Sequence, residues 1–375
     1  MKQAQSVSVD TSFEAMTAAD APSCWNYQHI IDSRSPAEFA LDHVPGAVNW
    51  PVLDSAQRES VGTLYQREGS FKAKLAGATL VARNIASLIE DRASSIDPHA
   101  RLLVYCWRGG NRSGALSTVL ARIGFRTDVL EGGYKAFRRW VIEDTARRAQ
   151  GLKFCIVAGR TGSAKTDLLH LLAQEGEQVI DLEALARHRG SLLGATPDSP
   201  QPSQRAFETS LWFQLARCQP GRLVWLESES RKIGQIQIPE SIIERMRSSP
   251  HYQLEVESKV RSKYLLDHYQ HWIREPERLQ AITLKLRPFL SSEAYAALEQ
   301  SLSQQRLEEF VSLLLKHHYD PLYDRSIAKN FRSEKRRIAL TALDGASLQD
   351  AVRQIREQHR DSAQVPEVGS FTAAA

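Results

Sequence analysis

Residues 105–113 have the sequence YCWRGGNRS, which places one cysteine at the start of a glycine-rich, doubly basic loop. The apolar run before the loop predicts a buried strand, and the apolar pattern over 113–123 predicts a helix. Cys106 would therefore lie where a strand ends and a helix begins. Loop amides, the helix N-terminus and the charges of Arg108 and Arg112 would favour its thiolate. The stretch predicts a nucleophilic, anion-binding cysteine rather than an inert buried one, with these three side chains as candidate catalytic residues.

Three further segments fit the same domain. Residues 32–39 (DSRSPAEF) follow a short apolar strand, residues 43–51 (HVPGAVNWP) come about one helix later, and residues 130–137 have the sequence LEGGYKAF. Together with the cysteine loop they resemble the rhodanese family, a single-cysteine α/β fold that carries sulfur or selenium as a persulfide or perselenide. One departure is that Arg112 lies six residues after Cys106, which is the Cys-x5-Arg spacing of protein phosphatases. The loop is therefore also a candidate site for a tetrahedral, phosphate-like anion.

Length and composition indicate a globular protein with more than one domain. The chain has 375 residues, of which 42% are hydrophobic and 25% are charged. No apolar run is long enough to cross a membrane, and the polar first 20 residues lack the apolar core of a signal peptide, so we expect a cytoplasmic protein. The four cysteines have no zinc-site spacing, and we assign no metal ligand. A net charge of +4 does not by itself predict nucleic-acid binding.

A second strand pattern over 153–158 runs into GRTGSAKT at 159–166, and an apolar helix follows. This order is typical of a P-loop, in which loop amides hold phosphates, Lys165 contacts the outer phosphate and Thr166 ligates Mg²⁺. Ala164 stands where the P-loop pattern has glycine, which weakens the case for ATP hydrolysis more than the case for diphosphate binding. Binding of ATP, of a prenyl diphosphate or of neither stays open from the sequence.

Two later strands of the predicted second sheet end in acidic side chains. Residues 178–183 have the sequence QVIDLE, and another strand runs into ESESRKIG at 227–234. Glu227 takes the place of the acidic residue beside a P-loop, where it would contact Mg²⁺ indirectly, while Arg231 and Lys232 would hold phosphate charge. Solvated ion pairs on a loop are the alternative interpretation. The candidate ligand-binding residues are Gly159, Thr161, Gly162, Ser163, Lys165, Thr166, Glu227, Glu229, Arg231 and Lys232.

The order of these parts is similar to that of one family. A rhodanese domain ahead of a P-loop resembles the bacterial tRNA 2-selenouridine synthases over roughly residues 25–325. The segments that carry the resemblance are DLE at 181–183, HRGS at 188–191, QP at 201–202, ESESRKIG at 227–234 and HYDPLY at 318–323. The resemblance implies a transferase that converts wobble 2-thiouridine of tRNA to 2-selenouridine. It implies selenophosphate as the selenium donor and an S-geranylated intermediate made from geranyl diphosphate.

The resemblance also implies the partners of each loop. The partners are tRNA carrying wobble 2-thiouridine, selenophosphate and geranyl diphosphate, without a membrane and without a tightly bound cofactor. Mg²⁺ is a candidate ligand at the P-loop. The residues divide between the two steps, since the Cys106 loop suits selenophosphate, whereas Lys165 and Thr166 suit the diphosphate of a prenyl donor. This division is a hypothesis at the level of sequence.

Two other functions stay open. The first is a Cys-x5-Arg phosphatase that uses Cys106 and Arg112, although Tyr105 stands where such enzymes usually have histidine. A phosphatase assay on the isolated domain, residues 1–150, would test it. The second is an ATP-dependent sulfur-transfer enzyme acting on a small molecule. ATP turnover without RNA would support this second function, and copurified RNA would count against it.

The predicted fold class is α/β, with an N-terminal rhodanese-like domain, then a P-loop NTPase-like parallel-sheet domain with a helical C-terminal region. Composition assigns no chemistry to the insert 54–80, which we interpret as a surface subdomain. The predicted divisions are a flexible lead-in over 1–20, the rhodanese-like domain over 21–140, a linker helix over 141–150, the P-loop domain core over 151–236, a mainly helical region over 237–360 that is a candidate for tRNA contact, and a disordered tail over 361–375.

Two basic clusters in the helical region are candidates for contact with RNA phosphates, although such runs are more often solvated helix faces. The first cluster comprises Lys329, Arg332, Lys335, Arg336 and Arg337, and the second comprises Arg245, Arg247, Lys259, Arg261 and Lys263. Candidate lining for a prenyl chain consists of Leu192, Leu193, Trp212 and Phe213, for which core packing is an equal explanation.

Overall fold

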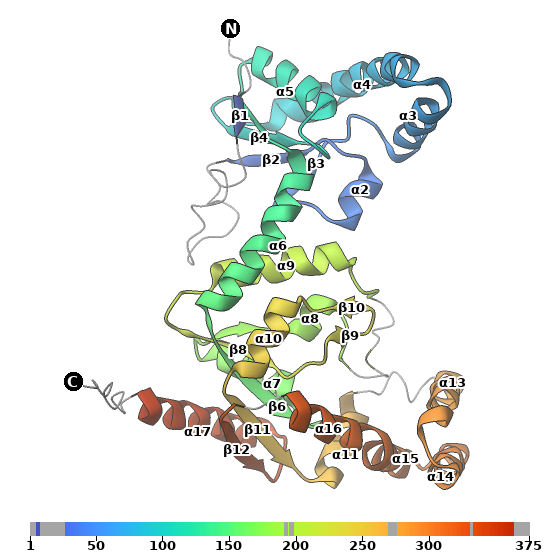
Figure 1. The fold of residues 1–375 in the computed structure, drawn as a ribbon, viewed down its shortest axis with the longest axis vertical. Coiled ribbons are helices and arrows are strands. Elements are labelled where there is room, and N and C mark those ends of the chain that lie inside the picture. The colour runs from blue at the N-terminus through green and yellow to red at the C-terminus, as the bar shows by residue number, and fades with distance from the viewer. Residues whose placement is uncertain are drawn as a thin grey trace, which may run out of the picture. The chain divides into compact units, whose positions relative to one another are not determined.

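The computed structural model describes residues 5–7, 27–190, 194, 199–268, 276–330 and 333–363, and these form two compact units (Figure 1). Unit 1 comprises Met1–Gly151, Pro200–Pro220 and Ile236–Ser241, and unit 2 comprises Leu152–Ser199, Gly221–Gln235 and Ile242–Ala375. The chain therefore passes between the units more than once, which a simple succession of domains would not do. The predictions for 1–20 and 361–375 lie outside the described residues, apart from 5–7 and 361–363.

Unit 1 is built on a parallel sheet of five strands in the order β1-β5-β4-β2-β3. The strands are β1 (Gln5–Val7), β2 (His29–Asp32), β3 (Ala47–Asn49), β4 (Arg101–Tyr105) and β5 (Arg126–Leu130). Alternate residues of β4 belong to two apolar cores, with Leu102 and Val104 in one and Leu103 and Tyr105 in the other. Because the strands are parallel, their carboxyl ends meet at one edge, where Cys106 follows β4.

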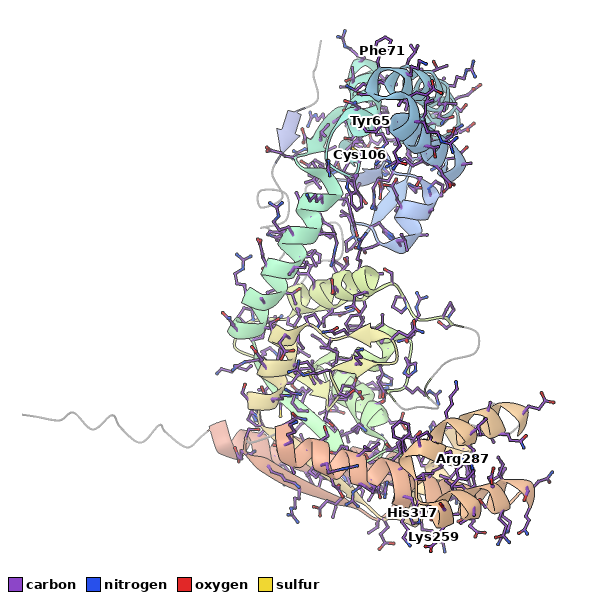
Figure 2. All side chains as sticks on the ribbon, turned by 45° about the vertical axis from the view of Figure 1, so that its right-hand side comes forward. Tyr65, Phe71, Cys106, Lys259, Arg287 and His317 are labelled. Atoms are coloured by element: carbon purple, nitrogen blue, oxygen red, sulfur yellow. The ribbon has the colours of Figure 1, made fainter. Side chains whose placement is uncertain are left out.

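The helices of unit 1 lie against this sheet or against one another. They are α2 (Pro36–Leu41), α3 (Ser55–Glu68), α4 (Ser70–Arg92), the 3₁₀ turn η2 (Ala93–Ser95), α5 (Asn111–Ile123), α6 (Gly133–Gly151) and α9 (Gln204–Arg217). The insert 54–80 forms α3 and the first half of α4, and Figure 2 labels its exposed side chains Tyr65 and Phe71. The predicted helix after the cysteine loop is present as α5, which buries Leu116 and Leu120.

The second half of α6 is part of the unit 1 core. It covers the expected linker 141–150 and packs against α9 with Val141, next to Trp140, whose ring lies 5.0 Å from that of Trp212. The Trp212 indole N–H donates a hydrogen bond of 2.8 Å to the buried Asp144 carboxylate. Helix α9 therefore completes unit 1, although its residues lie within the stretch 151–236 that the sequence assigns to the P-loop domain.

Unit 2 contains a second parallel sheet, in the order β12-β11-β6-β8-β7. Its strands are β6 (Lys153–Gly159), β7 (Gln178–Ile180), β8 (Leu223–Glu227), β11 (His251–Val256) and β12 (Lys335–Leu340). The α/β fold class is confirmed. The C-terminal region is mostly helical, as predicted, but it also supplies β11 and β12 at one side of the sheet. The carboxyl ends of β6, β7 and β8 meet at the edge that carries the P-loop.

The remaining elements are shorter or lie in the C-terminal region. They are α7 (Lys165–Gln174), α8 (Leu182–Ala186), β9 (Lys232–Ile233), β10 (Ile236–Gln237), α10 (Glu240–Ser248), α11 (Ser258–His268), α13 (Pro276–Leu286), η3 (Arg287–Phe289), α14 (Ser292–Ser303), α15 (Leu307–Leu314), the π-helical turn η4 (Leu315–Tyr319), α16 (Asp320–Asn330) and α17 (Gly345–Ala363). Within the described ranges, every helix is too short or too polar to span a membrane.

Candidate functional site

Cys106 lies between the end of β4 and the loop that leads into α5 (Figure 2). Its sulfur accepts hydrogen bonds from the Gly110 amide at 3.3 Å and from the Ser113 hydroxyl at 3.2 Å, and the residue is 4% exposed. Burial alone raises the pKa of the Cys106 thiol. Hydrogen bonds from Ser113 and the Arg108 amide, with the charge of Arg112, outweigh burial and lower the pKa below its ordinary value. The loop therefore favours a thiolate, and Ser113 contributes to this although the sequence interpretation assigned it no role.

The two candidate arginines are placed differently. Arg112 forms an ion pair of 2.7 Å with Glu38, and both side chains are half-buried. Burial raises the pKa of Glu38, but the hydrogen bond and charge of Arg112 lower it overall. The Arg108 side chain is exposed, so this residue acts on the sulfur through its backbone amide. Of the two guanidinium groups expected beside the cysteine, the structure fixes that of Arg112, with Glu38 as a partner that the local sequence did not reveal.

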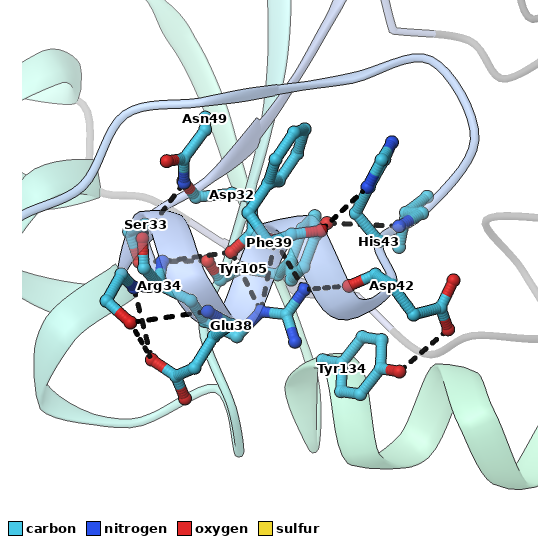
Figure 3. Close-up of polar contacts among 12 residues, drawn as sticks. Asp32, Ser33, Arg34, Glu38, Phe39, Asp42, His43, Asn49, Tyr105 and Tyr134 are labelled. Atoms are coloured by element: carbon cyan, nitrogen blue, oxygen red, sulfur yellow. Dashed lines mark hydrogen bonds and ion pairs between the residues drawn. The ribbon is translucent and has the colours of Figure 1, made fainter. Parts of the chain in front are cut away.

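A buried polar network supports the carboxyl edge of this sheet (Figure 3). Arg34 pairs with Asp32 at 2.6 Å and donates to the Asp42 carbonyl at 2.7 Å. The Tyr134 hydroxyl donates to the Asp42 carboxylate at 2.7 Å, and the Arg34 guanidinium lies 3.8 Å from the centroid of the Tyr134 ring. Burial of this ion pair is tolerated because the charges and lone pairs have several partners. The network joins the DSRSPAEF segment to the LEGGYKAF segment.

The glycine pair of LEGGYKAF holds the cysteine loop from the other side. The Tyr134 amide donates to the Cys106 carbonyl at 2.8 Å. Gly133 has φ +56°, and a Cβ on it would lie 2.3 Å from the Cys106 carbonyl oxygen and 2.5 Å from the Gly109 nitrogen. The two backbone segments are too close for any side chain, which explains the glycine at this position.

Gly133→Ala should lower the free energy of unfolding by about 2–4 kcal/mol, since the left-handed backbone costs an L-residue about 1–2 kcal/mol and the clash costs a similar amount. Urea unfolding followed by circular dichroism measures this loss. Gly69→Ala is the matched control, because Gly69 has φ +88° with nothing within 4 Å of an added Cβ. Equal losses in the two variants would contradict the close approach at Gly133.

The rate of Cys106 alkylation by iodoacetamide should rise with pH around a midpoint below that of an ordinary cysteine, because only the thiolate reacts and the site lowers its pKa. Burial raises the pKa of Cys155 to about 12 and that of Cys218 to about 11, so both stay protonated. Ser113→Ala should move the midpoint to higher pH and slow alkylation at neutral pH. Mass spectrometry of the Cys106 peptide measures the rate.

The control for this experiment is Ser117→Ala, because Ser117 is buried on the same helix and its hydroxyl donates to the Gly114 carbonyl at 3.1 Å. Its profile should match that of the unmodified protein. An unchanged profile for Ser113→Ala would show that the serine hydroxyl does not set the thiol pKa.

The second candidate site lies at the carboxyl edge of the unit 2 sheet. Residues 159–166 leave β6 and enter α7, and all of them except Arg160 line a cavity of about 820 Å³. The Lys165 ammonium donates to the Gly159 carbonyl at 3.0 Å, and the Thr166 hydroxyl donates to the Glu183 carboxylate at 3.3 Å. The side chain of Ser163 is buried. The loop therefore places backbone amides, an ammonium group and a hydroxyl around one cavity.

Ala164 occupies a left-handed conformation, with φ 56° and ψ 35°. Its methyl group is packed in the apolar core formed with β6 and α7. An L-residue in this region carries strain of about 1–2 kcal/mol, which glycine would avoid. The alanine therefore changes the side chain at this P-loop position while the chain keeps a backbone conformation suited to glycine.

Three glutamates from neighbouring segments gather beside the P-loop lysine. Glu227 is fully buried at the end of β8, where one carboxylate oxygen accepts the Glu183 amide at 2.9 Å and the other has no hydrogen-bond partner among the described residues. Burial and the adjacent carboxylates raise the pKa of Glu227. Burial and Glu183 also raise the pKa of Glu229 to about 8, against the opposing charge of Lys165. A Cβ on Gly190 would lie 2.7 Å from Glu183, so the DLE, HRGS and ESES segments meet here.

Oxygen donors of this kind suit Mg²⁺. The donors are the Thr166 hydroxyl and the carboxylates of Glu183, Glu227 and Glu229, and the buried Glu227 oxygen without a partner agrees with a cation nearby. In the part of the chain that the structure describes, no group of three or more His, Cys, Asp or Glu side chains is arranged to hold a metal ion by itself.

Several candidate residues lie away from the cavity. Arg231 and Lys232 are exposed and are not among its lining residues. Arg261 is 1% exposed and pairs with Asp320 at 2.7 Å, so it braces the C-terminal helices instead of presenting charge to RNA. Arg245 donates to the Leu152 carbonyl at 3.1 Å. Residues 335–337 of the first basic cluster lie on the strand β12 and not on a helix, and Arg332 lies outside the described residues.

Of the two explanations for the candidate prenyl lining, the structure favours core packing for the residues that it describes. Trp212 and Phe213 belong to the unit 1 core around α6 and α9, while Leu192 and Leu193 lie outside the described residues. The apolar wall of the P-loop cavity comes instead from the C-terminal helices. Its members are Tyr264 and Leu265 of α11, Tyr319 of η4, and Leu322, Tyr323 and Ile327 of α16. Three of these residues, Tyr319, Leu322 and Tyr323, belong to the HYDPLY segment at 318–323, which was singled out in the sequence for its resemblance to the family.

Comparisons with known proteins match the two halves of the chain to two different family models. A family model described as the rhodanese-like domain matches residues 15–139, and one described as the tRNA 2-selenouridine synthase AAA domain matches residues 152–282. Three proteins named tRNA 2-selenouridine synthase are similar over most of both chains. The protein from Sulfurovum sp. (strain NBC37-1) is 32% identical, covering 81% of this chain and 90% of its own. Those from Nitrosomonas europaea and Marinobacter nauticus are 30% and 33% identical, covering 84% and 80% of this chain and 91% and 88% of their own.

Proposed function

Since the chain belongs to the tRNA 2-selenouridine synthase family, we propose that it converts wobble 2-thiouridine of tRNA to 2-selenouridine with selenophosphate as donor, through a base S-geranylated from geranyl diphosphate. The observation that supports the details is that one chain has two different loops suited to anions. One loop contains Cys106, whose thiol pKa is lowered, and the other contains Lys165 beside a cavity with an apolar wall. Two successive reactions with two phosphorylated donors would use one loop each.

The P-loop would bind the diphosphate of the prenyl donor. All residues of the loop 159–166 except Arg160 line the cavity, and amides of this loop together with the Lys165 ammonium would donate to phosphate oxygens. In the reaction, the thiouridine sulfur forms a bond to the first prenyl carbon, the carbon–oxygen bond to diphosphate breaks, and its electron pair leaves with the diphosphate. Thr166 and the neighbouring glutamates would hold Mg²⁺, which when bound neutralises charge on the departing diphosphate.

The apolar wall of the same cavity would bind the hydrocarbon chain. Leu265 and Leu322 line it beside the P-loop glycines, and a Cβ on Gly162 would lie 2.8 Å from the Leu265 side chain. A cavity that is polar at one end and apolar at the other matches a prenyl diphosphate, which has the same division of chemistry. This wall is what favours a prenyl diphosphate over inorganic diphosphate as the ligand.

The cysteine loop would bind selenophosphate. Its amides already point at the Cys106 sulfur, and Arg112 stands at the start of α5 with Glu38 holding its orientation. Amides at a helix N-terminus and an arginine are the donors that bind a tetrahedral dianion. Selenium from this donor would then displace the geranylated sulfur from the base.

The test is mass spectrometry of nucleosides from 2-thiouridine tRNA incubated with the protein. Geranyl diphosphate and selenophosphate are added separately and together. We expect geranylated base with the first reagent alone and 2-selenouridine with both. A nucleoside that stays unchanged under every condition, with folded protein, would rule out this function.

A further inference from the structure

The cysteine loop carries a pattern that extends beyond one cysteine and one arginine. Starting at Cys106, a glycine follows after three residues, Arg112 after six, and Ser113 comes directly after the arginine. In the structure the Ser113 hydroxyl donates to the Cys106 sulfur at 3.2 Å. A thiolate at the floor of an amide-lined loop, with a guanidinium at the helix start and a hydroxyl bound to the sulfur, is an arrangement for attack on a tetrahedral phosphoryl group.

The ion pair with Glu38 leaves Arg112 able to hold such a group. Glu38 accepts two of the five guanidinium N–H donors, at 2.7 Å and 3.4 Å. The Glu38 carboxylate is itself fixed by the Ser35 amide at 3.1 Å and the Ser35 hydroxyl at 3.2 Å. Glu38 is therefore a positioning residue, because it fixes the plane of the guanidinium while three N–H donors stay available to phosphate oxygens.

Electron balance decides which atom of selenophosphate the sulfur attacks. Selenium in this donor is bonded to phosphorus and has the oxidation state of selenide. A sulfur–selenium bond formed with release of phosphate would require the removal of two electrons. The proposed reaction includes no oxidant that could accept them. Attack at phosphorus requires no oxidant.

We propose that the Cys106 thiolate attacks the phosphorus of selenophosphate, forming a cysteine–phosphoryl intermediate and releasing selenide for transfer to the base. This inference rests on the proposed function. The sulfur–phosphorus bond forms as the phosphorus–selenium bond breaks, and the electron pair of the broken bond leaves with selenium, which departs as the anion HSe⁻ with the proton that it carried in the donor. Water then attacks phosphorus, phosphate leaves, and the Cys106 thiolate is regenerated. HSe⁻ attacks C2 of the base, the carbon–sulfur bond to geranylthiolate breaks, and the selenium-bound proton passes to geranylthiolate, which leaves as geranylthiol.

The carboxylates near the loop agree with a selenide leaving group. Asp32 and Glu38 are tied to Arg34 and Arg112, so neither is placed as a proton donor. An alkoxide leaving from a phosphate ester needs a general acid, whereas hydrogen selenide is a far stronger acid than an alcohol and its anion leaves unprotonated. We therefore expect cleavage of phosphorus–selenium and phosphorus–sulfur bonds, and little cleavage of alkyl phosphate esters.

The test mixes the full-length protein with selenophosphate without tRNA, stops the reaction with denaturant, and measures the mass of the Cys106 peptide. We expect a phosphoryl adduct on Cys106. Ser113→Ala should slow adduct formation, because it raises the thiol pKa, but it should slow hydrolysis more, because the hydroxyl stabilises the thiolate that leaves in that step; the fraction trapped once the reaction is steady should therefore rise about tenfold. Arg112→Ala should slow adduct formation about 10²-fold, because a donor to the phosphoryl oxygens is lost. Ser117→Ala should behave like the unmodified protein.

The outcomes separate this inference from the proposed function. A selenium adduct on Cys106 would overturn the inference and leave the tRNA reaction standing. Conversion of tRNA to 2-selenouridine with no phosphoryl adduct in the unmodified protein or in Ser113→Ala would also overturn it. A phosphoryl adduct in a protein that leaves tRNA unchanged would support phosphoryl transfer at Cys106 and contradict the proposed function.

Discussion

Cys106→Ser should abolish formation of 2-selenouridine while the protein still makes the geranylated base. A serine hydroxyl is a far weaker nucleophile than the cysteine thiolate, and removal of an essential nucleophile commonly costs at least about 10³-fold in rate. The measurement is mass spectrometry of tRNA nucleosides after incubation with geranyl diphosphate and selenophosphate together. The geranylated base should accumulate, because the second step is blocked and the first is not.

The matched control is Cys218→Ser, because Cys218 is a buried cysteine of the same unit whose pKa is raised by burial. It should keep both steps. Selenouridine formed by Cys106→Ser at the rate of the unmodified protein would show that the cysteine loop is not the selenium site. A loss of both steps in Cys106→Ser with retained circular dichroism would contradict the division of the reaction between two loops.

Lys165→Ala should block geranylation and spare the selenium step. Loss of a cation that stabilises charge on a leaving group costs about 10²–10³-fold. Nucleoside mass spectrometry should show unmodified 2-thiouridine when the variant receives both donors. When the variant receives tRNA that was geranylated beforehand, 2-selenouridine should form at the normal rate, because the Cys106 loop lies in the other unit.

The matched control is Lys153→Ala, which tests whether the loss of geranylation is specific to Lys165. Lys153 is exposed at the start of β6, at the opposite end of the strand from the P-loop. Its variant should geranylate normally. Normal geranylation by Lys165→Ala would remove the P-loop from the prenyl step, and the cavity would then need another ligand.

Local sequence signals predicted the parts of the fold that depend on neighbouring residues. The strand before Cys106, the strand before the P-loop and the helices that follow them each combine an apolar run with a glycine loop, so their positions could be predicted. Helix α9 could be predicted as a helix but not as part of unit 1. Its apolar face fits any core, and the pairing of Trp212 with Asp144 joins residues that are 68 positions apart.

The same limit applies to the sites. The cysteine loop and the P-loop are continuous segments, so their residues could be named from the sequence. Glu38, which orients Arg112, is 74 positions away from it, and no local pattern links the two. Arg261 resembled a member of a solvated basic run, but its partner Asp320 lies 59 positions later and buries it. Charged residues in a run predict exposure only when no distant carboxylate pairs with them.

The assignment of α9 to unit 1 sets the order in which the two halves can be completed during synthesis. When residue 151 leaves the ribosome, α6 still presents the Trp140 and Val141 surface that α9 later covers. Unit 1 can reach its final packing only after Ser241 has emerged, by which time residues 152–199 and 221–235 of the second unit have also been made. A fragment of residues 1–150 would lack this covering helix, so the rhodanese half is not a module that truncation can release. Assays of its cysteine chemistry therefore belong in the intact chain.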